Sequence, residues 1–194
     1  MSILTLQNIA YSYADGTKNV LSGANYQFEQ GKFYAIVGNS GTGKSTLLGI
    51  LSGNDRPTGG RARVAGVELT TMNRAQRVDY QRHVTGFVRQ RTSSNLLPYL
   101  SAAENVALPM VIAGRRERDG RVRELLGLLG VSGCADRRPA QLSGGQQQRV
   151  GVARALATDP NILLMDEPFG AVDPIVRREL QDELLRLQAE LGKT

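Results

Sequence analysis

Several residue types that define whole classes of protein are scarce in this sequence. Its 194 residues include no tryptophan, 5% aromatic residues and a single cysteine, Cys134. A lone cysteine cannot form a disulfide within the chain, which excludes a disulfide-stapled fold and fits a reducing compartment. The length suits one domain with a hydrophobic core large enough to fold without such staples.

Long hydrophobic runs are also absent. The longest uncharged apolar stretch, Val106 to Gly114, contains Pro109 and falls well short of the ~20 residues that a membrane-spanning helix needs. The first residues carry no positive charge ahead of their apolar positions, so they do not form a signal peptide. We therefore expect a cytoplasmic protein that reaches a membrane through a partner.

Acidic residues are outnumbered, and the formal net charge is +6. A basic balance can indicate nucleic-acid, anionic-lipid or nucleotide partners. Here arginines alternate with acids, as in the run from Arg115 to Asp119, which indicates a solvated face. We therefore expect no nucleic-acid partner.

Lysine and arginine are unevenly distributed along the chain. Residues 1–55 contain three lysines and no arginine, whereas residues 56–186 contain twenty arginines and no lysine. One hypothesis is a seam near Asn54–Gly60 in a recombinant or engineered mosaic of related sequences. The alternative is chance combined with a high-GC coding bias, and uniform codon usage across the seam would exclude the mosaic.

Strand-like and helix-like segments alternate, which predicts an α/β fold. Phe33–Val37 is a continuous apolar run, typical of a strand buried on both faces. The other expected strands are Ile3–Ile9, Val20–Phe28, an exposed Arg61–Leu69, Val84–Arg89 and Asn161–Met165. One expected helix begins at Lys44, and a second begins near Ala102 after a capping box formed by Ser101 and Glu104. A third spans Glu117–Leu129, with Gly130 as its C-cap, and a fourth spans Gln146–Ala157. The last spans Pro174–Leu191, with Asp173 as its N-cap and its end at Gly192.

The first chemical motif is a glycine-rich loop between the Phe33–Val37 run and the next helix. Its residues 38–45 match G-x-x-x-x-G-K-[ST], the loop that wraps a phosphate chain with inward-pointing backbone N–H groups. Lys44 would reach the β- and γ-phosphates, and Ser45 would bind Mg²⁺. The expected nucleotide contacts are Gly38, Asn39, Ser40, Gly41, Thr42, Gly43, Lys44, Ser45 and Thr46.

The second motif is an apolar strand that ends in two acids. Asp166 and Glu167 follow Ile162–Met165 at the carboxyl end of the strand, where α/β proteins bind ligands. Asp166 suits a carboxylate linked to Mg²⁺, and Glu167 suits a general base that polarises the attacking water.

The third motif is Leu142–Gln146, in which Ser143, Gly144, Gly145 and Gln146 begin a helix. A helix start rich in N–H groups is a second anion site. The chain thus has two helix starts that can bind an anion but a single phosphate loop. This suggests that the phosphate loop of one copy faces the Leu142–Gln146 site of another copy.

These three motifs, in this order, resemble the ATP-binding cassette of ABC transporters, and the likeness covers nearly the whole chain. The resemblance implies a P-loop NTPase with a mainly parallel central sheet, an N-terminal antiparallel β subdomain, and an inserted helical subdomain at residues 91–141. The whole chain, 1–194, would be one such domain. The implied cofactors are ATP and Mg²⁺.

The resemblance also assigns roles at matching positions. Gln90 corresponds to the family's glutamine that contacts the metal and senses the membrane partner. The expected catalytic residues are therefore Glu167, Gln90 and Lys44. The expected metal ligands are Ser45, Gln90 and Asp166. Tyr13 would stack on adenine, with Tyr11 as the alternative. Ser143 and Gly145 would contact the γ-phosphate of the opposite subunit, and Asp173 would reach across the dimer. The implied partners are a second copy, head to tail, and permease subunits at the inner face of the cell membrane.

The chain departs from the family pattern at its end. The family carries a switch histidine after one further strand, whereas the single histidine here, His83, precedes Gln90 and is expected at a surface or helix end. In the family that strand lies between the strands leading to Lys44 and Asp166. We therefore expect exposed apolar surface there, and slow or absent hydrolysis.

Two other functions compete with that of a transport ATPase. One is a soluble ABC protein acting on nucleic acid or ribosomes, and the other is a catalytically impaired nucleotide-binding fragment. Gln90–Pro109 resembles cassettes of lipoprotein release and macrolide export, whereas Asp166–Thr194 resembles cassettes of osmoprotectant uptake. The sequence therefore defines neither the cargo nor the direction of transport.

Overall fold

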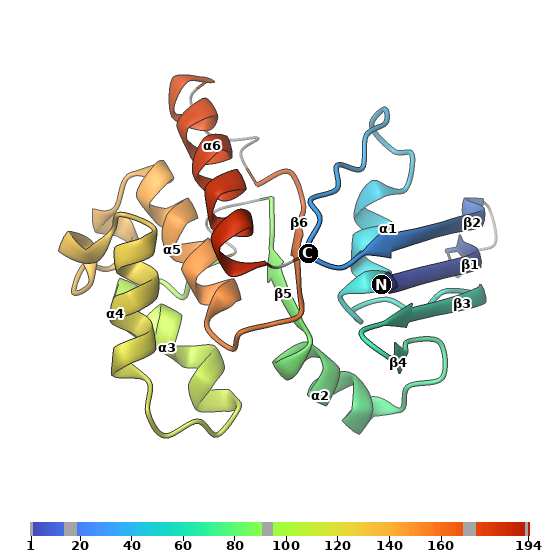
Figure 1. The fold of residues 1–194 in the computed structure, drawn as a ribbon, viewed down its shortest axis with the longest axis horizontal. Coiled ribbons are helices and arrows are strands. Elements are labelled where there is room, and N and C mark those ends of the chain that lie inside the picture. The colour runs from blue at the N-terminus through green and yellow to red at the C-terminus, as the bar shows by residue number, and fades with distance from the viewer. Residues whose placement is uncertain (1, 14–18, 91–94, 169–173, 193) are drawn as a thin grey trace.

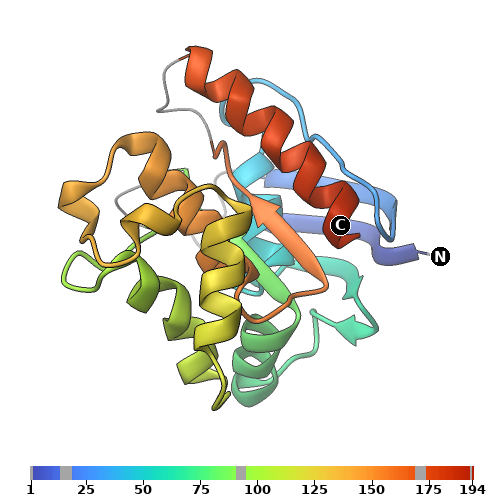
Figure 2. The same ribbon diagram turned by 60° about the vertical axis from the view of Figure 1, so that its left-hand side comes forward.

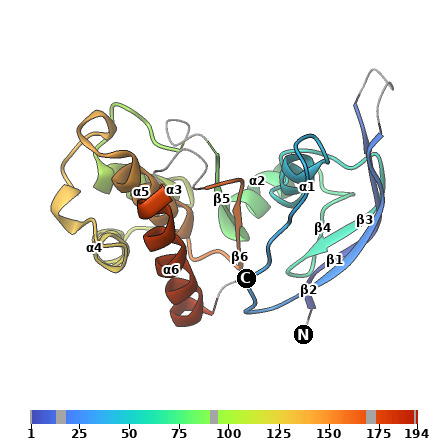
Figure 3. The ribbon, with the colours of Figure 1, turned by 90° about the horizontal axis from the view of Figure 1, so that it is seen from above.

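The computed structural model describes residues 2–13, 19–90, 95–168, 174–192 and 194. It places an antiparallel sheet at one end, a group of helices at the other, and a parallel strand pair between them (Figures 1 and 3). The predicted α/β class is confirmed. Asp173 lies outside the described residues.

The antiparallel sheet has the strand order β2-β1-β3-β4. Its strands are β1 (Ser2–Ser12), β2 (Asn19–Glu29), β3 (Gly59–Val64) and β4 (Val67–Glu68). The inner face of β1 presents Leu4, Leu6 and Ile9, all buried. The strict alternation breaks at Asn8, which has a φ of 51° and lies within a register shift. Both predicted strands in this region, Ile3–Ile9 and Val20–Phe28, are therefore confirmed.

The parallel pair consists of β5 (Thr85–Val88) and β6 (Ile162–Met165), with Thr85 opposite Ile162 and Val88 opposite Met165. Helix α1 (Lys44–Leu51) packs between this pair and the antiparallel sheet, so Leu51 shares a core cluster with Leu4 and Ile162. Helix α5 (Gly144–Leu156) covers the other face. A Cβ on Gly86 would lie 2.4 Å from the carbonyl oxygen of Ala155, which explains the glycine at this close approach.

The helical end consists of α3 (Ala102–Ile112), α4 (Asp119–Leu128), two short 3₁₀ turns (Ser132–Cys134 and Pro139–Gln141) and α5. The predicted capping box before α3 is present: Glu104 N donates to Ser101 Oγ (3.2 Å), and Ser101 N donates to Glu104 Oε2 (2.7 Å). Gly130, after α4, has the left-handed φ of 64° that a C-cap requires.

Helix α6 (Pro174–Leu191) ends before Gly192, as predicted, and lies alongside β6 (Figure 2). Its buried Leu184 belongs to the same core cluster as Leu156 of α5. Among the described helices, none combines the length and apolar character needed to cross a bilayer.

The prediction of a strand at Phe33–Val37 is wrong. These residues form no ladder with any described strand, and 50% of Phe33, 38% of Ile36 and 88% of Val37 remain exposed. A continuous apolar run predicts burial, but a strand also needs a paired neighbour, and no described strand lies against this one. The parallel sheet of the described residues therefore consists of β5 and β6.

Two further differences concern residues 59–83. The single exposed strand expected at Arg61–Leu69 is a hairpin, β3 and β4, turning at Ala65 and Gly66, and Ala62, Val64 and Leu69 are buried. Helix α2 (Arg74–His83) was not predicted, because Tyr80 is its one buried residue and leaves no apolar periodicity. The available signal was the capping box, in which Asn73 Oδ1 accepts from Gln76 N at 2.9 Å. As expected, His83 lies at a helix end.

Candidate functional site

The glycine-rich loop is held between β2 and α1. Gly41 and Gly43 have φ angles of 78° and 92°, which side chains other than glycine adopt at a cost. A Cβ on Gly43 would also lie 2.9 Å from Leu21 Cδ2 and 3.0 Å from the Val20 carbonyl oxygen. Gly43 is the N-cap of α1 and provides no side-chain cap, so the first N–H groups of the helix are available to an anion.

Lys44 lies within the curve of this loop. Its Nζ donates to the carbonyl oxygens of Gly38 (2.8 Å) and Asn39 (2.9 Å). Thr42 Oγ1 donates to the same Asn39 oxygen at 2.8 Å and so tightens the loop. The ammonium is therefore placed where a wrapped phosphate chain would pass.

Ser45 and Asp166 meet although they are 121 positions apart in the sequence. Ser45 Oγ, on the first turn of α1, donates to Asp166 Oδ1, just after β6, at 3.1 Å. A hydroxyl and a carboxylate beside a phosphate loop are the hard oxygen donors that Mg²⁺ prefers. Across the described ranges, no group of three or more His, Cys, Asp or Glu side chains is arranged to hold a metal. This fits Mg²⁺, which commonly takes one or two carboxylates and completes its shell with phosphate and water oxygens.

Gln90 and Glu167 form a second contact across the end of the parallel pair. Gln90 Nε2 donates to Glu167 Oε2 at 2.8 Å, so the residues that follow β5 and β6 are joined at their side chains. Glu167 has a φ of 45°, in the left-handed region that non-glycine residues seldom occupy. The extended backbone of β6, which ends at Met165, therefore does not continue through Glu167.

Asn95 supports Gln90, and it was not predicted as a site residue. The buried Asn95 side chain accepts from Arg89 N (2.8 Å) and donates to Arg89 O (2.8 Å), which fixes the backbone next to Gln90. Arg154 Nη1 donates to the Asn95 carbonyl at 2.5 Å. Burial lowers the pKa of the Arg154 guanidinium, and the nearby Arg89 lowers it further. Nothing in the local sequence distinguishes Asn95 from a loop asparagine, because its partners are Arg89, directly after β5, and Arg154 of α5.

The start of α5 is capped by its own side chains. Gln146 N donates to Ser143 Oγ (3.3 Å) and Ser143 N donates to Gln146 Oε1 (3.0 Å). Ser143 and Gly144 are exposed. Figures 1 and 3 show α5 and α1 on opposite sides of the parallel pair, so one chain does not bring residues 143–146 to its own phosphate loop.

Tyr13 lies just after β1 and is 52% exposed. Its ring meets that of Tyr11 edge to face, with centroids 5.5 Å apart and planes at 89°. Tyr11 is partly buried and packs against the core of the antiparallel sheet. The greater exposure favours Tyr13 as the ring that would stack on a base.

The fold and this arrangement of loop, lysine, hydroxyl and acids define a P-loop NTPase. The family described as ABC transporter matches residues 21–170, and the chain belongs to this family. The chain is 45% identical over 186 residues to an ABC transporter ATP-binding protein of Thermotoga maritima, covering 95% of this chain and 78% of that relative.

Two other relatives are much longer than this chain. One is the trimethylamine N-oxide transport system ATP-binding protein TmoW of Pelagibacter ubique, 42% identical over 176 residues, with 90% of this chain and 51% of TmoW covered. The other is the macrolide export ATP-binding/permease protein MacB of Salmonella typhimurium, 44% identical over 197 residues, with 100% of this chain and 30% of MacB covered. The chain thus spans about half of TmoW and less than a third of MacB. Neither match is confined to one side of Asn54–Gly60, and the mosaic remains a hypothesis.

Solved cassettes share the fold. The dimeric post-hydrolysis structure of the ATP-binding cassette MJ0796, bound to ADP and Pi, has a TM-score of 0.86 and 36% identity, and the match covers 98% of this chain and 85% of that one. CbiO1 of Clostridium perfringens, part of the ABC transporter complex cbiONQ, has a TM-score of 0.88 and 30% identity over 98% of this chain and 75% of that one.

Proposed function

We propose that this protein binds Mg-ATP at the interface of a head-to-tail pair of its own chains and hydrolyses it to drive permease subunits at the inner face of a cell membrane. The observation that carries the proposal is the contact between Ser45 and Asp166 (3.1 Å), directly beside the phosphate loop and Lys44. This contact joins the phosphate-binding and metal-binding motifs in one place. Family membership and the names of the relatives point to the same activity.

The loop residues have defined roles in this proposal. The Lys44 ammonium already lies inside the loop, where it donates to the carbonyls of Gly38 and Asn39. On nucleotide binding it exchanges these bonds for bonds to β- and γ-phosphate oxygens. Ser45 and Asp166 would hold Mg²⁺, with Gln90 as a further ligand. When bound, Mg²⁺ neutralises charge on the phosphate oxygens. Tyr13 stacks on the base.

Glu167 is the proposed general base, and its environment bears on the rate. Gln90 Nε2 already donates to the Glu167 carboxylate, so an attacking water has to compete for that oxygen. The segment 33–37, which leads into the phosphate loop, is unpaired among the described strands. We therefore infer that nucleotide binding is retained while turnover stays below about 1 per second, at the slow end of the ordinary enzyme range.

The head-to-tail pair follows from the separation of two anion-binding helix starts. The starts of α1 and α5 lie on opposite sides of the parallel pair, so a phosphate chain bound at α1 is reached by Ser143 and Gly145 from another copy. The solved cassette MJ0796 is described as dimeric and bound to ADP and Pi.

The test of the proposed function is a thermal melt with and without Mg-ATP. Ligand at about a hundred times its Kd should stabilise the fold by ~2.7 kcal/mol, which for this size is roughly 5–11 °C. Lys44→Ala should lose this shift, because the variant lacks the ammonium that binds the phosphates. Lys32→Ala, which removes another lysine, should keep it. Equal shifts in the parent and in Lys44→Ala would contradict the proposed site.

A further inference from the structure

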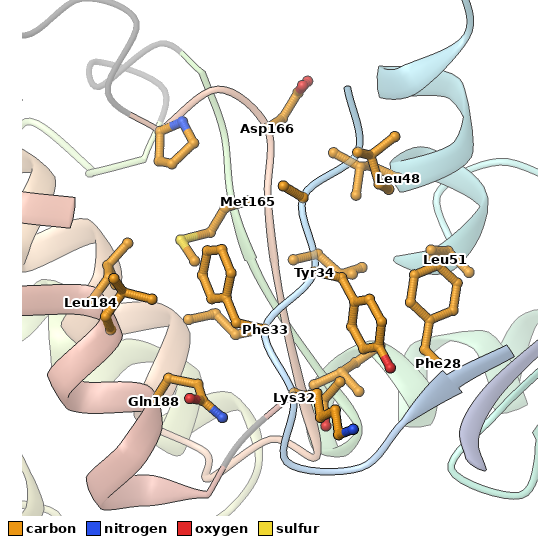
Figure 4. A pocket seen from close by; sticks show the side chains of 18 of the residues that line it. Phe28, Lys32, Phe33, Tyr34, Leu48, Leu51, Met165, Asp166, Leu184 and Gln188 are labelled. Atoms are coloured by element: carbon orange, nitrogen blue, oxygen red, sulfur yellow. The ribbon is translucent and has the colours of Figure 1, made fainter. Parts of the chain in front are cut away.

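In the proposed pair, each nucleotide lies between two halves of a site that come from different chains. One half contains the phosphate loop, Ser45 and Asp166. Asp166 lies at one end of a hydrophobic pocket beside β6, across from Leu48 of α1 (Figure 4). The other half is the start of α5, residues 143–146. Because N–H groups bind a phosphate only along fixed directions, this half depends on how the backbone leading into α5 is held.

The first turn of α5 leaves the N–H groups of Gly144 and Gly145 for an anion. The first N–H groups of any helix have no partner within that helix. Here Ser143 N donates to the Gln146 side chain, and Gln146 N donates to Ser143 Oγ. Among the residues that the structure describes, none accepts a hydrogen bond from Gly144 N or Gly145 N. These two groups, together with the Ser143 hydroxyl, are therefore the ones that a phosphate on another copy can reach.

The Gln147 side chain holds the backbone that enters this turn. Its Nε2 donates to the carbonyl oxygen of Leu142 at 3.1 Å and to that of Pro139, eight positions earlier, at 2.9 Å. Its backbone N donates to the Ser143 carbonyl at 2.9 Å. One glutamine therefore fixes the carbonyl before Ser143 as well as the carbonyl of Ser143 itself.

The backbone that Gln147 grips is anchored to the rest of the helical end. Leu142 N donates to the Pro139 carbonyl at 3.1 Å, and the Leu142 side chain is buried in the core cluster that includes α3 and α4. Just before this turn, the Arg137 carbonyl accepts from Ala102 N at the start of α3 (2.8 Å). Gln147 therefore connects the start of α5 to backbone that is also bonded to α3, rather than to an unsupported loop.

The bond to Leu142 controls the direction of Ser143. The Leu142 carbonyl and Ser143 N belong to one planar peptide unit, so neither can turn without the other. If the carbonyl lost its partly buried partner, it would turn toward water to regain a hydrogen bond. Ser143 N would then move away from Gln146, and the first turn of α5 would lose its present direction.

We propose that Gln147 is a positioning residue for the nucleotide held by the opposite chain. It keeps the Leu142–Ser143 peptide unit in the orientation that aims the Ser143 hydroxyl and the N–H groups of Gly144 and Gly145 at that nucleotide. Gln147 acts through these neighbours and does not touch the nucleotide itself. The inference rests on the proposed head-to-tail pair, and it adds a residue that determines how tightly the pair closes around Mg-ATP.

The test measures the dissociation constant of the dimer with Mg-ATP, by light scattering over a range of protein concentrations, in chains that carry Glu167→Gln. Adding Gln147→Met removes the amide donors while keeping a neutral side chain of similar length. The dissociation constant should rise by about tenfold or more, because the carbonyls of Pro139 and Leu142 lose the amide. The Mg-ATP melting shift of the monomer should be unchanged, because the phosphate loop lies on the other side of the parallel pair.

The matched control is Gln81→Met on α2. It makes the same substitution at a glutamine whose Nε2 donates to Asn54 Oδ1 at 3.0 Å, away from both halves of the site. The dimer should keep its dissociation constant. Equal weakening in Gln81→Met and Gln147→Met would overturn the inference, because any lost glutamine contact would then have the same effect.

Hydrogen exchange in the monomer separates positioning from a general loss of stability. In Gln147→Met, exchange at the N–H groups of Ser143 and Gln146 should be at least about threefold faster, whereas exchange at Val150 and Ala153 in the middle of α5 should be unchanged. Faster exchange throughout α5 would overturn the inference, because Gln147 would then stabilise the whole helix.

Rescue by arginine gives a second, independent reading. Gln147→Arg restores N–H donors at the same position, so the dissociation constant should return to within about threefold of the Glu167→Gln chain. The rescue should persist at about 0.5 M salt, where attraction between the added charge and the nucleotide is screened. A rescue that disappears in salt, or an equally tight dimer in Gln147→Met, would overturn the inference alone. A Glu167→Gln chain that stays monomeric with Mg-ATP would instead overturn the proposed pair, and this inference with it.

Discussion

At the scale of single residues, Glu167 combines an uncommon backbone angle with a specific partner. Its φ of 45° costs on the order of 1–2 kcal/mol relative to ordinary backbone. Its carboxylate accepts from Gln90. Strain of this kind persists where surrounding structure fixes it, and it clusters at sites with a function.

The first prediction concerns the Glu167 carboxylate. Glu167→Gln keeps the shape of the side chain but removes the base, so the rate of phosphate release should fall by about 100-fold or more. The Mg-ATP melting shift should persist, because Lys44, Ser45 and Asp166 are unchanged. Glu117→Gln, a charge-matched change outside the site, should leave both readings as in the parent. Unchanged phosphate release in Glu167→Gln would remove this residue from the chemistry.

The second prediction concerns Gly43. Gly43→Ala adds a methyl at a φ of 92° and at 2.9 Å from Leu21, so unfolding should become easier by about 2–4 kcal/mol and the Mg-ATP shift should be lost. Gly66→Ala is the matched control, because Gly66 has a similar φ of 84° with no atom within 4 Å of the added methyl. Urea unfolding should therefore show a smaller loss for Gly66→Ala, and its nucleotide shift should remain. Equal losses in the two variants would mean that the contact with β2 does not matter.

At the scale of elements, local signals and tertiary pairing contribute differently. Ser101 with Glu104 predicted the start of α3, because a capping box is complete within four residues. Phe33–Val37 was predicted as a strand and is not paired, because ladder formation depends on a neighbour elsewhere in the chain. Likewise, Gln90 and Glu167 were each proposed from the sequence, but their contact spans 77 positions and needs the parallel pair to form.

Tyr80 is the buried residue of helix α2. Tyr80 donates to the Leu51 carbonyl at 2.5 Å, at the end of α1. Burial strongly raises the pKa of the Tyr80 hydroxyl. The folded chain therefore keeps a proton that the unfolded chain releases near the usual tyrosine pKa of about 10.

The third prediction is a loss of stability in alkali. Since the folded form binds more protons, the free energy of unfolding should be fully retained below pH ~10 and decrease as the pH rises further. Tyr80→Phe should be less stable at pH 8 by about 1–3 kcal/mol, because the Leu51 carbonyl loses its partner, but its stability should fall less steeply above pH 10. Urea unfolding at pH 8 to 11 measures both effects.

The control for this prediction is Tyr99→Phe, because Tyr99 is 66% exposed. The free energy of unfolding of Tyr99→Phe should fall with pH as steeply as that of the parent. Lys32, whose pKa is raised by its hydrogen bond with Glu29, contributes equally to all three proteins. If the free energy of unfolding fell equally steeply with pH in the parent and in Tyr80→Phe, the Tyr80 hydroxyl would not be the source of the loss of stability in alkali.

At the scale of the whole molecule, the proposed head-to-tail pair rests on the two helix starts that lie on opposite sides of the parallel pair. Each chain would supply the phosphate loop to one nucleotide and residues 143–146 to the other. The sequence predicted both motifs, but it did not show that one chain keeps them apart, because that depends on how α5 packs on β5.

The fourth prediction tests this assembly. Glu167→Gln with Mg-ATP should migrate as a dimer in size-exclusion chromatography with light scattering, because bound ATP is not consumed. Adding Ser143→Asp should give a monomer that still shows the Mg-ATP melting shift. Aspartate preserves the N-cap of α5 but places a negative charge against the γ-phosphate of the other copy.

The matched control adds Ser101→Asp, which makes the same change at the capping box of α3. It should leave the dimer intact. A dimer that survives Ser143→Asp, or one lost equally in both variants, would contradict the head-to-tail arrangement.

The position of Thr194 has a practical consequence for handling the protein. Any sequence attached there begins beside Leu163 and Gly31, because the backbone N–H groups of both residues donate to Thr194. A purification tag on the carboxyl end would therefore start next to β6 and could alter the segment that leads into the phosphate loop. A tag at the amino end instead extends from β1, at the antiparallel sheet, and is the better choice for every measurement proposed above.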